Sequence, residues 1–185
     1  MGLHAPTANV GEFAGDLYAA IEAVPRAERN IEPWLKSLDR IENQSHLIEV
    51  MAVDTWLVND DRNMGNVIGS SIGEGRVRVY MIDFEKFRTL GQNPFISSGS
   101  VDPKYLQPKE DLRKLLSQRR PSKFPTEIMD KIRVVSGEQI METIAPVAKE
   151  LPYVNWWEDS VEVLCRRAKN IDTLVNEVWS AWKTN

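Results

Sequence analysis

The sequence predicts an α+β domain that is mostly helical and contains one small β-hairpin. Three observations lead to this class. Apolar residues recur at helical intervals in several segments, residues 45–58 are apolar almost all round, and residues 76–82 alternate between polar and apolar. With 185 residues, 42% of them hydrophobic, the chain can bury one core. We therefore expect a single domain over residues 1–185.

The N-terminal part of the chain has weaker patterns. Residues 1–12 show no periodicity, and we expect irregular structure there. The apolar residues of segment 13–24 stand at helical intervals, which predicts a helix that Pro25 ends.

The middle of the chain predicts a buried helix, a polar loop and a hairpin. A helix as apolar on all sides as segment 45–58 lies inside a core rather than on a surface. The loop follows it, and glycines within residues 70–75 then provide a turn before the strand pattern. The hairpin 66–83 would hold Asn66 at one end and Asp83 at the other.

The C-terminal part predicts further helices. We expect them near residues 109–118 and 125–146, and a last helix that starts with a capping box of Asp159 and Glu162. The six tryptophans are expected to pack in the core or a lid, and the alternative for Trp179, which lies off the apolar stripe of this last helix, is an interface. The stripe consists of Val161, Leu164, Ala168, Ile171, Val175, Val178 and Trp182.

Composition limits the classes of function. A net charge of −4 argues against general nucleic-acid binding. No apolar run reaches membrane-spanning length, and the N-terminus lacks the pattern of a signal peptide. Cys165 is the single cysteine, so no intrachain disulfide can form. These features lead us to expect a soluble cytoplasmic protein without nucleic-acid or membrane partners.

The polar loop carries residue types that suit phosphoryl transfer. That reaction needs Mg²⁺ held against phosphates and an acceptor hydroxyl held in line. Asp61 and Asn66 can face one cleft, and Asp83 can join them if the hairpin returns beside the loop. Arg62 suits a carboxylate partner that keeps the loop in shape, and Asp54 is expected to be a buried carboxylate bonded to Arg62 or to backbone. The same residues would also suit an ordinary polar turn.

The pattern resembles a known family. The HipA-like kinases, and most closely their small-kinase branch, have a catalytic segment similar to residues 54–66 and Ile82-Asp83, with the pattern D-x-W-x-x-N-x-D-R-x-x-G-N followed by I-D. The likeness covers residues 40–185 well and residues 1–39 weakly.

This resemblance implies the C-terminal lobe of a protein-kinase-like fold, with the metal site on the hairpin. By carry-over, Asp61 is the catalytic aspartate, and Asn66 and Asp83 are the metal ligands. Arg62 and Asp54 support the loop. The implied cofactors are Mg²⁺ and ATP, and Ser or Thr of a protein is a candidate acceptor.

The chain departs from the family before residue 45, where we find no phosphate-covering glycine loop and no ATP-binding lysine strand. We therefore expect the chain alone to be weakly active or inactive, and an N-terminal lobe or a regulatory protein to be its partner. An apolar face beside 45–58 and 76–82 would promote that binding, or self-association. The alternatives are a non-enzymatic interaction or regulatory module, a subunit of a split kinase, or a fragment of a phosphatidylinositol-kinase-like lipid kinase.

Overall fold

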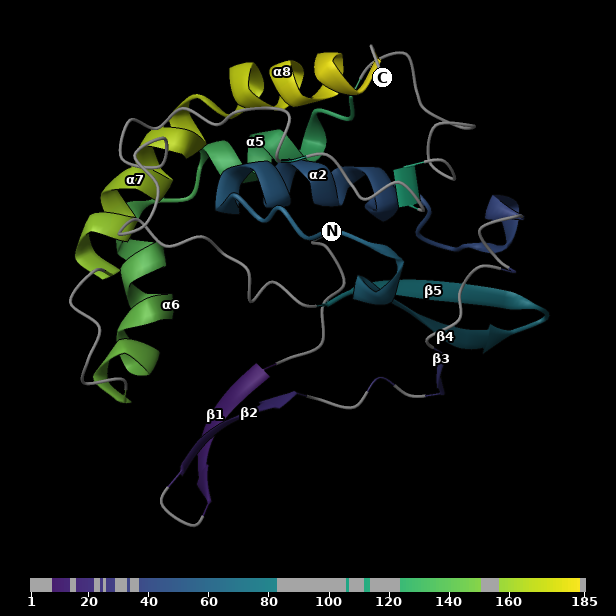
Figure 1. The fold of residues 1–185 in the computed structure, drawn as a ribbon, viewed down its shortest axis with the longest axis horizontal. Coiled ribbons are helices and arrows are strands. Elements are labelled where there is room, and N and C mark those ends of the chain that lie inside the picture. The colour runs from purple at the N-terminus through teal and green to yellow at the C-terminus, as the bar shows by residue number, and fades with distance from the viewer. Residues whose placement is uncertain are drawn as a thin grey trace.

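The structure is a computed structural model, and it describes residues 8–13, 16–21, 24, 26–28, 33, 37–82, 106, 112–113, 124–150 and 157–183. Helices form most of the regular structure, and the strands form two small antiparallel sheets (Figure 1). The expected class, α+β and mostly helical, is confirmed.

The expected hairpin is present as β4 (Val67–Gly73) and β5 (Arg76–Met81). Val67 lies opposite Met81, so the beginning of β4 and the end of β5 are side by side. A short third strand, β3 (Ala27–Glu28), pairs with the other edge of β4. Alternate side chains of β5 point into the core, as the two-residue period of a strand requires; these are Val77, Val79 and Met81.

The N-terminal segment differs from its predicted structure. β1 (Ala8–Phe13) and β2 (Asp16–Ile21) form an antiparallel hairpin, so the helix predicted for 13–24 and the irregular structure predicted for residues 8–12 are wrong. A spacing of four residues is close to one turn of a helix and equals two repeats of a strand, so apolar residues at this spacing fit both structures. The sequence signal that separates these readings is Gly15, a residue type that favours turns.

Helix α2 (His46–Leu57) is the central element of the helical part. α5 (Glu127–Arg133) and α8 (Ile171–Lys183) pack on it, and β5 lies on its other side (Figure 1). α6 (Gly137–Glu150) and α7 (Trp157–Lys169) pack together at one end of this layer. Two short 3₁₀ turns, Leu38–Arg40 and Met64–Asn66, flank α2 in the chain. None of the described helices could span a membrane.

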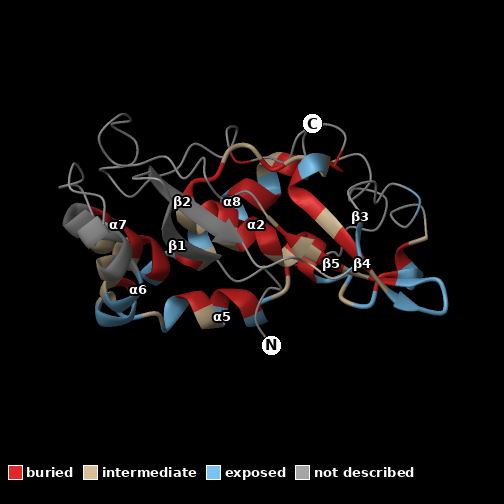
Figure 2. Cartoon of the chain, turned by 90° about the horizontal axis from the view of Figure 1, so that it is seen from below, coloured by how far each residue is buried: buried red, intermediate tan, exposed pale blue. Residues whose placement is uncertain are grey.

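The core forms around α2, and Figure 2 shows this helix among buried residues, while the tip of the β4–β5 hairpin is exposed. The buried helix expected at 45–58 is thus confirmed. Trp179 contacts Phe124 and Trp182 edge to face, each with ring centroids 5.3 Å apart, and only 3% of its surface is exposed. Trp179 is therefore a core residue, as expected for the tryptophans, and the alternative of an interface at this ring is wrong.

The helix predicted for 125–146 is two helices. α5 ends at Arg133 and α6 begins at Gly137. Between them Ser136 forms a reciprocal cap, in which its N–H donates to Gln139 Oε1 (2.9 Å) and the N–H of Gln139 donates to Ser136 Oγ (3.1 Å). This cap starts a new helix where the sequence analysis expected continuation.

The last predicted helix is also two helices, separated by Asn170. Its Nδ2 donates to Arg166 O (3.0 Å), and its own carbonyl accepts the N–H of Leu174 (3.1 Å), so one residue closes α7 and opens α8. The capping box predicted at Asp159 is wrong, because α7 already begins at Trp157.

The apolar stripe continues across the break between α7 and α8. All stripe members except Val161, which is half-buried, are buried.

Of the helix predicted near 109–118, the structure describes only residues 112 and 113, which are helical.

Asn43 fixes the hairpin to the start of α2. The N–H of Val79 donates to Asn43 Oδ1 (2.8 Å), and Asn43 Nδ2 donates to Val79 O (2.8 Å) and contacts His46 Nδ1 (2.9 Å). The side chain thereby replaces a neighbouring strand on this edge of β5. The two elements that flank the polar loop are therefore held at a fixed separation.

The large apolar side chains among the described residues are well covered. Only Ile72 and Val134 are exposed in this part of the chain. The exposed apolar face expected beside 45–58 and 76–82 is therefore not found there.

Candidate functional site

The polar loop, residues 59–66, begins with a sharp turn at Val58. This residue follows α2 and adopts a left-handed conformation with φ 57° and ψ 46°. A β-branched residue rarely adopts this conformation, because its side chain crowds the backbone. The N–H groups of Val58 and Asn59 both donate to Asp54 O, the latter at 2.9 Å. The strained turn redirects the chain at the end of the helix.

A buried ion pair anchors the loop to α2. Arg62 Nε donates to Asp54 Oδ2 and Arg62 Nη2 donates to Asp54 Oδ1, each at 2.8 Å. Both side chains are only 2% exposed, so water screens this bidentate pair very little. The carboxylate partner of Arg62 is therefore Asp54.

The third nitrogen of Arg62 ties the two ends of the hairpin together. Nη1 donates to Ile82 O (2.8 Å), just beyond β5, and to Asn66 O (3.3 Å), just before β4. The N–H of Ile82 also donates to Asn66 O (3.0 Å). One guanidinium thus connects the helix, the loop and both hairpin strands.

Burial and hydrogen bonding act on Asp54 in opposite directions. Burial raises the pKa of the Asp54 carboxyl above its usual value of 3.8, while the hydrogen bonds and charge of Arg62 and the hydrogen bond of Asn59 lower it. Asn59 Nδ2 donates to Asp54 Oδ1 at 2.8 Å, so the carboxylate receives three donors. This is a costly group to bury, and its partners make it tolerable.

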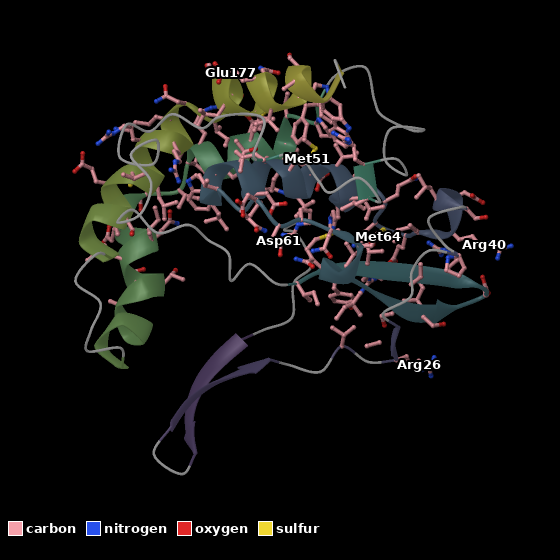
Figure 3. The ribbon with its side chains drawn as sticks, in the orientation of Figure 1. Arg26, Arg40, Met51, Asp61, Met64 and Glu177 are labelled. Atoms are coloured by element: carbon pink, nitrogen blue, oxygen red, sulfur yellow. The ribbon has the colours of Figure 1, made fainter. Side chains whose placement is uncertain are left out.

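The backbone of Asp61 is held at both of its polar groups. Its N–H donates to Asn59 Oδ1 (3.3 Å), and its carbonyl accepts Asn63 Nδ2 (2.9 Å) and Asn66 Nδ2 (3.1 Å). The side chain of Asp61 is half-buried. Figure 3 shows Asp61 on the segment that runs between α2 and the β4–β5 sheet.

Gly65 allows the tight path of the loop. Its N–H donates to Asn63 Oδ1 (2.8 Å), and a Cβ added at this position would lie 3.0 Å from the same oxygen. Asn63 and Asn59 received no role in the sequence analysis. The available signal was their residue type, because asparagine in a turn often bonds nearby backbone.

Asn66 presents its amide in a defined direction. Its Nδ2 is bonded to the Asp61 carbonyl, so its Oδ1 faces away from that bond. Within the described part of the chain, no hydrogen bond reaches this oxygen. Likewise, no group of three His, Cys, Asp or Glu side chains that could hold a metal is found among the described residues.

The structure brings four of the five expected site residues into one network, namely Asp54, Asp61, Arg62 and Asn66. The fifth, Asp83, lies outside the described residues, directly after Ile82 in the chain.

No protein-family model, curated protein or solved structure matches the chain.

Proposed function

We propose that this chain is the C-terminal lobe of a HipA-like kinase, which transfers a phosphoryl group from ATP to a hydroxyl with the help of Mg²⁺. The observation that carries the proposal is the hydrogen bond from Asn66 Nδ2 to the Asp61 carbonyl. It links the residue proposed for the metal to the residue proposed for the acceptor.

Asn66 and Asp83 are proposed to hold the metal. Mg²⁺ prefers hard oxygen ligands, and the orientation of Asn66 leaves its amide oxygen as the end that can bind. Asp83 follows Ile82, whose N–H is bonded to the Asn66 carbonyl. When bound, Mg²⁺ would neutralise charge on the transferring phosphate.

Asp61 is proposed to orient the acceptor hydroxyl and receive its proton. Its carboxylate is half-buried on a backbone that three asparagine side chains hold in place. Arg62 and Asp54 contribute no contact to the reaction in this scheme. They fix the loop between α2 and the hairpin.

Completion by an N-terminal lobe is part of the proposal. Kinase-type sites hold ATP between two lobes, and the first lobe covers the phosphates. Arg62 cannot take that role, because its nitrogens are bonded to Asp54, Ile82 and Asn66. We expect the chain alone to bind Mg·ATP weakly and to turn it over slowly.

A titration with ATP, followed by NMR with and without Mg²⁺, tests this function at millimolar ligand. Asp83→Asn should abolish the Mg²⁺-dependent part of binding, while Asp61→Asn should retain it. Asp61→Asn should instead remove the residual transfer of labelled phosphate from ATP. Asp60→Asn is the matched control, since Asp60 neighbours Asp61 and has no assigned role. Binding that is indifferent to Mg²⁺, or equal loss of affinity in both site variants, would contradict the proposal.

A further inference from the structure

Asn59 lies between the buried ion pair and Asp61. Its Nδ2 donates to Asp54 Oδ1 at 2.8 Å, and its Oδ1 accepts the backbone N–H of Asp61 at 3.3 Å. Only 1% of Asn59 is exposed. Its side chain is thus a bridge from the charged group inside the fold to the backbone of the loop.

The direction of this bridge is fixed by chemistry. An ionised carboxylate only accepts hydrogen bonds, so the amide nitrogen of Asn59 must face Asp54. The amide oxygen then necessarily faces the N–H of Asp61. A flipped amide would place oxygen against the Asp54 carboxylate and leave two donors facing each other at Asp61.

We infer that Asn59 is a positioning residue for Asp61. It transmits the fixed orientation of the Asp54–Arg62 pair to the backbone that carries the Asp61 carboxylate. Asn63 and Asn66 bond the carbonyl of Asp61, whereas Asn59 bonds its N–H. The positioning of Asp61 by Asn59 rests on geometry alone. Its effect on catalysis rests on the proposed function.

Amide hydrogen exchange tests the positioning without any activity. Asn59→Ala should speed exchange of the Asp61 N–H about fivefold, the effect of losing one hydrogen bond. The matched control is Asn43→Ala, which removes an asparagine that also bonds backbone, but at Val79 in β5 rather than at Asp61. It should leave exchange at Asp61 within about twofold of the parent. Equal acceleration at Asp61 in both variants would overturn the inference, because it would report general loosening.

A further variant guards against misfolding. Asn59→Leu fills a similar volume without polar atoms, and it replaces the alanine variant if that variant does not fold. Exchange of the Asp61 N–H should be faster than in the parent in this variant too. Exchange at the rate of the parent would overturn the inference.

Transfer of labelled phosphate from ATP then separates positioning from catalysis. Asn59→Ala should lower kcat about tenfold with Mg·ATP affinity within about twofold of the parent. Faster exchange at Asp61 in Asn59→Ala, together with ATP binding by the parent that is indifferent to Mg²⁺, would refute the proposed function and leave the positioning intact. Intact transfer with no effect of Asn59→Ala would refute the catalytic meaning of Asn59 alone.

Discussion

Replacing Arg62 by methionine is the sharpest test of the network that supports the loop. The variant leaves the Asp54 carboxylate buried without its bidentate partner and removes the donor to Ile82 O and Asn66 O. Breaking a buried pair costs about 3–5 kcal/mol, and each lost hydrogen bond to a carbonyl adds about 1 kcal/mol. We expect a total loss of about 5–7 kcal/mol, against a stability of about 5–15 kcal/mol for a typical domain.

Urea denaturation, followed by tryptophan fluorescence, measures this loss. The midpoint should fall by about 2.5–3.5 M, given a slope of about 2 kcal/mol per molar urea. Asp54→Asn added to Arg62→Met should recover about 1–3 kcal/mol, because a neutral amide is cheaper to bury alone than a carboxylate. Arg78→Met is the control: Arg78 pairs with Glu42 on the surface, and its loss should cost about 0–1 kcal/mol.

The cost of Arg62→Met should also depend on pH. Without Arg62, the pKa of Asp54 rises further above 3.8, since burial is then opposed only by Asn59. When the pKa of a carboxyl is higher in the folded than in the unfolded state, the folded protein becomes less stable as the pH rises through the folded-state pKa. It becomes more stable again as the pH falls. The difference in free energy of unfolding between the parent and Arg62→Met should therefore become smaller as the pH falls from neutral toward the usual carboxyl pKa of 3.8. A constant difference, or an unchanged urea midpoint, would refute the reasoning.

Three further predictions concern single residues. Arg167 is buried, and its Nε and Nη2 have no hydrogen-bond partner in the part of the chain that the structure describes. Burial lowers the pKa of this guanidinium to about 10. Arg167→Met should therefore raise Tm by a few degrees, and a fall in Tm would contradict this. Leu164→Asp or Ile171→Asp should unfold or aggregate the chain, since each buries a charge without a partner; circular dichroism spectra like the parent's would show that the stripe is not core. Gly65→Ala should disturb the Asn63 contact and weaken Mg²⁺-dependent ATP binding at least severalfold; unchanged binding in an NMR titration would show that this contact is dispensable.

The sequence predicted the elements whose patterns have a single interpretation. Segment 45–58 is too apolar to lie on a surface, and the glycines after Asn66 permit only a tight return of the chain. The β1–β2 hairpin was missed because a spacing of four fits both periods. The breaks at Ser136 and Asn170 were missed because capping depends on side-chain hydrogen bonds that periodicity does not report.

The candidate site was predicted in its residue types and in the Arg62–Asp54 pair, but not in the connections made by its asparagines. The loop pattern identified Asp61, Asn66 and Arg62, because carboxylates, amides and a guanidinium have a limited set of uses at such spacing. The roles of Asn59 and Asn63 depend on which way each amide points. That direction is set by tertiary partners such as Asp54, and the sequence alone does not contain it.

The central claim is that the loop and the end of β5 form a site for metal-bound nucleotide. Mn²⁺ can replace Mg²⁺, and it broadens NMR signals of nearby nuclei. Addition of Mn²⁺ with ATP should broaden the side-chain amide signals of Asn66 before those of Asn43, and Asp83→Asn should prevent this at the same concentrations. Broadening that starts elsewhere, or that Asp83→Asn leaves unchanged, would contradict the claim.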